Sequence, residues 1–327
     1  MEAGIRTFPS GRSHTLRGYI YIATATFLWS VSATLGRAAF TGRLLPGGKA
    51  LAPIDPLILS QSRVTISFLI LLPVLLWWRG PKRLRLPPAD ILRTVLLGVL
   101  GTASANYLYY LGIQRTNVAT AIILQYTAPV WVLLYTFVRG VRKPTFERVA
   151  AVALAVMGIT LVTGVFGAGG LRLDAIGVAA ALLSAFAFAF YAIFGHGIFV
   201  RCDRWVVLLY MIGSASLFWA LVNPPWKLAA SQYSKEQGIF LVVFSLVSAL
   251  APFSFYAAGL EYLEPTRAIV VSCLEPVFAI VLAAIALGEI LRPLQTAGIV
   301  LVLTAIVVVQ ISGRGAREPV TIVEPIE

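Results

Sequence analysis

Long runs of apolar residues alternate with short polar segments along most of the chain. A helix needs about 20 apolar residues to cross the hydrocarbon core of a bilayer, and these runs reach that length without the alternation of a barrel strand. Helices are therefore the only spanning structure that the pattern favours. We predict ten of them, at Leu16–Phe40, Leu57–Trp78, Ile91–Gly112, Ala119–Val138, Val149–Phe166, Ile176–Val200, Trp205–Val222, Gly238–Leu260, Arg267–Leu287 and Leu294–Ile311.

The composition agrees with a chain that is embedded in lipid. Of 327 residues, 59% are hydrophobic and only 12% are charged. A soluble domain of this size does not hide so much apolar surface. The polar, basic segment Met1–Arg17 is followed by a long apolar run, so we expect a retained first span rather than a signal peptide.

The net charge of +12 does not require a nucleic-acid partner. The basic residues cluster between the apolar runs, where the orientation rule of membrane proteins accounts for them. If the N-terminus is cytoplasmic, 17 of the 26 Lys and Arg residues fall on the cytoplasmic side. We therefore predict that both termini are cytoplasmic and that no nucleic acid is bound.

Metal, disulfide and cofactor chemistry is not indicated. Cys202 and Cys273 lie far apart with no Cys-x-x-Cys, and the only histidines are His14 and His196. The sequence lacks the clustered ligands of a metal site and the paired cysteines of a disulfide framework, so we expect no cofactor.

The chain repeats itself at a constant offset of 147 residues. Unrelated apolar helices share Leu, Ile and Val, but they seldom share Tyr, Gly and Pro in one register. The matches are Tyr109-Tyr-Leu-Gly112 with Tyr256-Ala-Ala-Gly259, Ala121-Ile122 with Ala268-Ile269, and Pro129-Val130-Trp131 with Pro276-Val277-Phe278. We infer a duplicated unit, with domains at 1–166 and 171–313 and a cytoplasmic tail at 314–327.

Five spans in each copy predict two halves of opposite orientation. Because five is odd, the second copy enters the membrane from the other side, and the repeats are inverted. Inverted repeats around a site at the bilayer midplane are typical of secondary transporters. The predicted fold is therefore an all-α integral membrane protein, with ten transmembrane helices as two inverted five-helix repeats around a central cavity.

The second half carries motifs that resemble a known family. Leu274-Glu-Pro-Val-Phe278, Leu287-Gly-Glu289 and Pro293-Leu-Gln-Thr-Ala-Gly298 resemble the EamA-type ten-helix exporters of the drug/metabolite transporter superfamily. The resemblance covers about Arg17 to Ile311. The first half departs from it, because Ala128 stands where the second half has Glu275.

The resemblance implies a multi-pass protein of the bacterial inner membrane that exports small metabolites, commonly amino acids, by alternating access. Some members are aromatic amino-acid exporters of the YddG type, which carry Trp before the proline of the fourth span, where this chain has Ala128. We expect a monomer that exports neutral or aromatic amino acids. The alternative is a broad-specificity exporter of drugs and cations from the same superfamily.

Polar and aromatic side chains inside the spans are the candidates for the substrate site. Such groups are unfavourable against lipid and face the bundle interior, where they either line a cavity or hold helices together. Gln125 and Tyr126 precede Pro129 by four and three residues, where a proline leaves a backbone carbonyl free. The candidates are Trp29, Ser30, Asn106, Tyr109, Gln125, Tyr126, Tyr256 and Ser272.

Three titratable residues are candidates for coupling or gating. Glu275 lies within a span, where a charge costs about 3 kcal/mol unless it is paired or wetted, so it is either a proton site or half of a fixed ion pair. Arg63 either meets a carboxylate, of the substrate or of Glu275, or extends to the interface. His196 can titrate near neutral pH, although a lone histidine is more often a satisfied hydrogen-bonding group.

Pro129 and Pro276 occupy the same place in the two copies. We predict that they bend two related helices towards the midplane, so that one gate closes as the other opens.

Other function classes lack their residues. No Ser/His or Asp/Asp arrangement recurs for an intramembrane enzyme, no filter loop indicates a channel, and no phosphate-binding loop indicates an ATP-driven pump. A nucleotide-sugar carrier needs several basic residues in its cavity, and the spans supply chiefly Arg63. We therefore expect a transporter without enzymatic activity, driven by a substrate or ion gradient.

Overall fold

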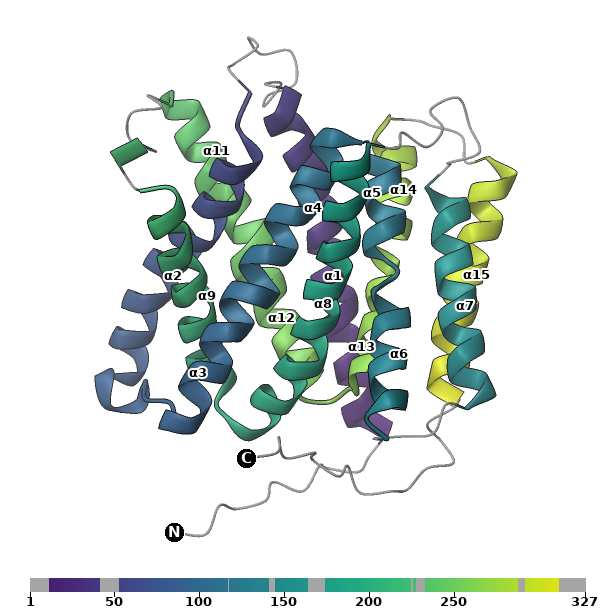
Figure 1. Cartoon of the computed structure of the whole chain (residues 1–327), viewed down its shortest axis with the longest axis horizontal. Helices are drawn as coiled ribbons and strands as arrows, with labels where there is room; N and C mark the ends of the chain where they lie inside the picture. The colour runs from purple at the N-terminus through teal and green to yellow at the C-terminus, as the bar shows by residue number, and fades with distance from the viewer. Residues whose placement is uncertain are drawn as a thin grey trace.

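The computed structural model describes residues 12–41, 53–116, 118–140, 145–163, 174–224, 226–227, 233–287 and 292–311. Every regular element among these residues is helical, and the helices form one bundle with their ends gathered at two opposite faces (Figure 1). The elements are α1 (Arg12–Thr41), α2 (Pro56–Arg79), η1 (Pro81–Arg83), α3 (Pro88–Leu96), η2 (Leu97–Ala103), α4 (Ser104–Arg115), α5 (Val118–Gln125), α6 (Ala128–Val138), α7 (Phe146–Val162), α8 (Ala175–Arg201), α9 (Arg204–Val222), α11 (Lys235–Ser245), η3 (Leu246–Leu250), α12 (Ala251–Leu260), α13 (Pro265–Ser272), α14 (Leu274–Leu287) and α15 (Pro293–Ile311).

Several of these elements follow one another without a loop, so the described residues form ten helical rods. Each predicted span falls on one rod, although the last residues of Val149–Phe166 lie outside the described residues, as do Glu289 and the tail 314–327. Among the described residues, six rods are long and apolar enough to cross a membrane, and Pro293–Val309 is apolar but shorter. That all ten rods cross the membrane stays a prediction.

Short polar residues set where several helices begin. The carboxylates of Asp55, Asp174 and Asp203 accept hydrogen bonds from the first free backbone N–H groups of α2, α8 and α9. A side-chain oxygen at this position satisfies a donor that the helix itself cannot, and a negative charge suits the positive end of the helix dipole. At the other end of α2, Gly80 adopts a φ of 72°, which lets the chain reverse towards α3.

Two irregularities recur in both halves of the chain, here called the first half (α1 to α7) and the second half (α8 to α15). The π-helical segments η2 and η3 interrupt the third and eighth rods. Turns interrupt the fourth rod at Tyr126 and the ninth at Cys273, which are 147 residues apart in the sequence. Each turn lies three residues before a proline, Pro129 or Pro276, because proline lacks an N–H and its ring clashes with the carbonyl four residues earlier.

The most extensive helix contacts join one half to the other. α7 packs along α15, α4 along α8 and α1 along α12 (Figure 1). The first of these contacts depends on two glycines, because a Cβ on Gly298 would lie 2.6 Å from the carbonyl oxygen of Gly158. The halves are therefore interleaved, and the interior between them is lined by residues from both.

Candidate functional site

A cavity of about 60 Å³ lies between the halves. Its wall combines one basic residue, one acidic residue, several amides and hydroxyls, and a set of aromatic rings. The lining residues are Trp29, Ser32, Arg63, Gly101, Thr102, Ala105, Asn106, Tyr109, Tyr110, Gln125, Tyr126, Phe188, Tyr191, Phe253 and Glu275.

Arg63 is the basic residue of the cavity, and its side chain is held from three directions. Nη1 donates to Oδ1 of Asn106 at 2.7 Å and to the hydroxyl of Tyr110 at 2.9 Å, and Nη2 donates to the carbonyl oxygen of Ser248. The residue is only 3% exposed, and these bonds offset part of the cost of burying a guanidinium. None of the ion pairs among the described residues includes Arg63.

Glu275 is the acidic residue of the cavity and lies in the first turn of α14. Its Oε2 accepts a hydrogen bond of 2.6 Å from the hydroxyl of Tyr126. The start of a helix favours a negative charge through the helix dipole. The turn at Tyr126 and the start of α14 therefore bring the hydroxyl of Tyr126, from the first half, into hydrogen-bond contact with the carboxylate of Glu275, from the second half. Among the described residues, Glu275 makes no ion pair with Arg63.

Aromatic rings form a large part of the wall. The ring of Trp29 lies 6.0 Å from that of Phe188 and 5.7 Å from that of Phe253, both edge to face. Tyr256 lies 5.3 Å from Trp29 and 5.6 Å from Tyr191, so it supports these rings without lining the cavity itself. Edge-to-face pairs stabilise ring positions by about 0.5–1.5 kcal/mol each, which keeps the wall in shape.

The structure brings together most of the residues that the sequence suggests for the site. Trp29, Asn106, Tyr109, Gln125 and Tyr126 line the cavity together with the two charged residues. Trp29, Asn106 and Tyr109 lie within helices, Gln125 is the last residue of α5, and Tyr126 lies in the turn before Pro129.

Four other candidates do not line this cavity. The hydroxyl of Ser30 donates to the carbonyl oxygen of Phe27, and that of Ser272 to the carbonyl oxygen of Ala268. Nδ1 of His196 lies 2.8 Å from the carbonyl oxygen of Leu260. Tyr256 lies behind Trp29, as described above.

Sequence reasoning missed several wall residues, notably Thr102, Tyr191 and Phe253. The spacing of aromatic residues in the sequence could have indicated Tyr191 and Phe253. Residues three apart share a helix face, and Tyr191 follows Phe188 by three residues while Phe253 precedes Tyr256 by three. Thr102 lies in η2, and nothing in the apolar pattern marks a π-helical segment.

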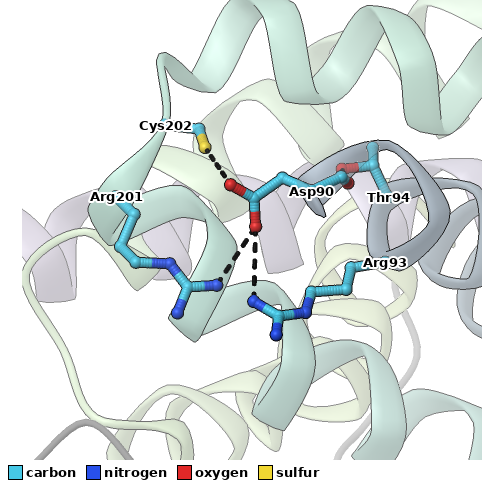
Figure 2. Close-up of polar contacts among 5 residues, drawn as sticks. All are labelled: Asp90, Arg93, Thr94, Arg201 and Cys202. Atoms are coloured by element: carbon cyan, nitrogen blue, oxygen red, sulfur yellow. Dashed lines mark hydrogen bonds and ion pairs between the residues drawn. The ribbon is translucent and has the colours of Figure 1, made fainter. Parts of the chain in front are cut away.

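A cluster of charges that does not line the cavity lies at the start of α3 and the end of α8. These helix ends share one end of the bundle with the start of α1 (Figure 1). Figure 2 shows the centre of the cluster, the carboxylate of Asp90 in the first turn of α3. Oδ1 lies 3.3 Å from Nη2 of Arg201 and 3.5 Å from Nη1 of Arg93, and the thiol of Cys202 donates to Oδ2 at 3.5 Å. Burial, followed by the charge and hydrogen bond of Asp90, raises the pKa of the Cys202 thiol to about 11.

Further ion pairs lie at the same end of the bundle. Arg79 lies 2.7 Å from Asp203. Nitrogen–oxygen distances are 3.6 Å between Arg148 and Glu264, and 3.0 Å between Arg204 and Glu261. The pairs at Arg79, Arg148 and Arg201 join the two halves, whereas Arg204 and Glu261 both belong to the second half.

Comparison with known proteins places this architecture among transporters. The EamA-like transporter family matches residues 16–164 and again residues 175–311. The "Uncharacterized inner membrane transporter YicL" of Salmonella typhimurium is 23% identical over 277 residues, covering 79% of this chain and 89% of that protein. The threonine/homoserine exporter RhtA of Escherichia coli K12 is 28% identical over 258 residues, covering 77% of this chain and 82% of that protein.

A solved crystal structure has the same fold. It superposes with a TM-score of 0.73 at 19% sequence identity, over 94% of this chain and 100% of that chain.

Proposed function

Because the chain belongs to the EamA-like transporter family and is a membrane transporter, we propose that it exports neutral or aromatic amino acids by secondary-active alternating access. The proposal includes ten membrane-spanning helices, arranged as two inverted repeats with both termini in the cytoplasm. The name of RhtA as a threonine/homoserine exporter supports an amino-acid substrate.

The observation that carries the proposal is the presence of two opposite charges on one cavity wall without a direct ion pair between them. An amino acid at neutral pH has a carboxylate and an ammonium group. Arg63 offers a guanidinium edge to the carboxylate, and Glu275 offers an oxygen to the ammonium group. A fixed Arg63–Glu275 pair would have left neither charge available to a substrate.

Two features support alternating access between inverted halves. α1 and α8 begin at opposite ends of the bundle (Figure 1), and the turns at Tyr126 and Cys273 recur at the repeat offset. The cavity of about 60 Å³ is also far below the roughly 300 Å³ of small ligand pockets, so the walls have to separate for substrate entry.

One other substrate class has an observation in its favour. Glu275 with the rings of Trp29, Tyr126 and Phe188 on one wall suits an organic cation, as in a drug exporter. The buried guanidinium of Arg63 on the same cavity repels a cation, which is why we favour a zwitterion.

Purified protein in liposomes tests the proposal. We expect efflux of labelled threonine, methionine or phenylalanine above that of protein-free liposomes, and little efflux of a cationic dye, each measured with and without a pH gradient. Arg63→Gln is expected to lower amino-acid efflux about tenfold or more, since hydrogen bonds to charged groups contribute about 1.5–3 kcal/mol. Arg83→Gln, at an exposed position of η1, serves as the control.

Efflux of the dye without efflux of any amino acid would overturn the proposal in favour of a cation exporter. Amino-acid efflux at the same rate with and without the pH gradient would leave the proposed substrate class standing, but it would contradict a role of Glu275 as a proton carrier.

A further inference from the structure

Four buried polar atoms on the cavity wall have no hydrogen-bond partner among the described residues. They are Nε of Arg63 and the hydroxyls of Thr102, Tyr109 and Tyr191. The four residues are 3%, 2%, 8% and 1% exposed. Leaving a buried donor unpaired costs free energy, so a group of such atoms around one cavity indicates a binding site for a polar ligand.

Many hydroxyls elsewhere in the bundle avoid this cost, whereas those of Ser60, Ser62 and Ser184 also lack a partner among the described residues. Ser67, Thr94 and Ser254 each donate to a backbone carbonyl one turn earlier in their own helix. Even within the π-helical region, the hydroxyl of Ser104 reaches the carbonyl oxygen of Val99 at 2.9 Å. Thr102 lies two residues before Ser104 and makes no such bond, and a tyrosine side chain is too long to turn back on its own backbone.

The four atoms divide into two groups by what they can bind. Nη1 of Arg63 already donates to Asn106 and Tyr110, and Nη2 donates once to Ser248, so the Nε–H and the second N–H of Nη2 remain for a carboxylate. The hydroxyls of Thr102, Tyr109 and Tyr191 can each donate and accept, and they have no charge to match. They therefore suit a neutral hydrogen-bonding group.

We propose that the exported amino acid has a small polar side chain, whose hydroxyl or amide group is bound by Thr102, Tyr109 and Tyr191. This inference rests on the proposed function and narrows its substrate class. A wall that hydrogen-bonds a substrate hydroxyl discriminates strongly against an apolar molecule of the same shape, because binding that molecule leaves the wall hydroxyls unpaired. Phenylalanine likewise offers the wall hydroxyls no hydrogen-bond partner.

Threonine and valine provide the test, because they have the same shape and differ by one hydroxyl. In liposomes containing the full-length wild-type protein, we expect threonine efflux to exceed valine efflux about tenfold or more. Tyr109→Phe, Tyr191→Phe and the isosteric Thr102→Val each remove a wall hydroxyl, so each is expected to lower the ratio of threonine efflux to valine efflux several-fold. Phenylalanine efflux is also expected to fall below threonine efflux.

Tyr107→Phe is the matched control. It lies on α4 with Tyr109, its ring packs 5.3 Å from that of Trp219, and it does not line the cavity. The threonine-to-valine ratio of this variant is expected to equal that of the wild type.

Equal efflux of threonine and valine by the wild type would overturn the inference while leaving amino-acid export intact. An unchanged ratio in all three wall variants would also overturn it. If no amino acid is transported, the proposed function fails as well, and the two failures are thereby distinguished. The wild-type ratio decides the matter even if one of the variants fails to fold.

Discussion

At the scale of residues, the two charged side chains of the cavity, Arg63 and Glu275, differ in the number of hydrogen bonds that hold them. Arg63 is fixed by Asn106, Tyr110 and Ser248, which lie on two other rods. Among the described residues, Glu275 has a single side-chain hydrogen-bond partner, the hydroxyl of Tyr126. We therefore expect Arg63 to act as a fixed anchor and Glu275 to be the group that changes partner as substrate arrives.

Cys202 reports on the charge of Asp90, which lies outside the cavity. Burial and the neighbouring carboxylate raise the pKa of the thiol to about 11, so the reactive thiolate is scarce near neutral pH. Asp90→Asn removes the negative charge, lowers the pKa and increases the thiolate fraction. We expect alkylation of Cys202 by N-ethylmaleimide to become several-fold faster at pH 7.5.

The rate is measured by mass spectrometry of the labelled protein, with Cys202→Ser as the background. Cys273 is fully buried and should contribute little to that background. Equal rates in the wild type and in Asp90→Asn would show that Asp90 does not control the thiol.

At the scale of elements, the fourth and ninth rods are each interrupted by a turn, which lies just before Pro129 or Pro276. Pro129→Ala restores a backbone N–H that can bond to the carbonyl of Gln125, and Pro276→Ala does the same for its own rod. Straighter rods would hold Tyr126 and Glu275 in one relative position. We expect either variant to reach the membrane but to lower amino-acid efflux, as measured in liposomes.

Pro73→Ala is the control for this prediction, because Pro73 lies inside α2 and does not line the cavity. Efflux at the wild-type rate in both Pro129→Ala and Pro276→Ala would show that the interruptions of these two rods are not needed for transport.

The contact between α7 and α15 depends on the absence of side chains at Gly158 and Gly298. A Cβ on Gly298 would lie 2.6 Å from both the Gly158 carbonyl oxygen and the Val162 nitrogen, which are backbone atoms that cannot rotate away. We expect Gly298→Ala to push the helices apart and to destabilise the protein by about 1–3 kcal/mol. Thermal unfolding in detergent should show a lower midpoint.

Gly197→Ala provides the comparison, because a Cβ there meets no atom within 4 Å. Alanine has the higher helix propensity, so this variant should be as stable as the wild type or more so. An unchanged midpoint for Gly298→Ala would mean that α7 and α15 are free to separate.

The hydrophobic pattern predicts the helices well and the irregularities inside them poorly. Span limits follow from apolar length, but the hydrophobic pattern does not indicate the caps Asp55, Asp174 and Asp203. The segments η2 and η3 are as apolar as their surroundings, so periodicity does not distinguish π-helical from α-helical turns. Pairing between Asp90 and Arg201 spans 111 residues, and only tertiary packing brings these residues together.

At the scale of the whole molecule, the two ends of the bundle are closed by different interactions. At the end where α1 begins, ion pairs of Arg79, Arg148 and Arg201 join the halves. At the opposite end, among the described residues, Gln61 and the α9 cap Asn223 exchange two hydrogen bonds of 2.7 and 2.6 Å. Charged pairs respond to salt and to charge removal, whereas neutral amide pairs respond little.

If alternating access opens the end with the ion pairs, these pairs must separate in the open state. Arg201→Gln removes a pair between the halves, and Arg204→Gln removes a pair within the second half. Partly exposed pairs contribute about 0.2–1 kcal/mol, so removal of one should increase the open population by up to about fivefold. Arg204→Gln should leave the open population unchanged, although both variants lose one positive charge.

A cysteine on the cavity wall measures this population. Ser32 lines the cavity, so Ser32→Cys in a Cys202→Ser background can be labelled by a membrane-impermeant maleimide added at either face. At the face that carries the ion pairs, labelling should be faster with Arg201→Gln than with Arg204→Gln, and high salt should reduce the difference by weakening the pair in the parent protein. Equal labelling in the two variants would mean that the ion pairs fix loops to helices without controlling access to the cavity.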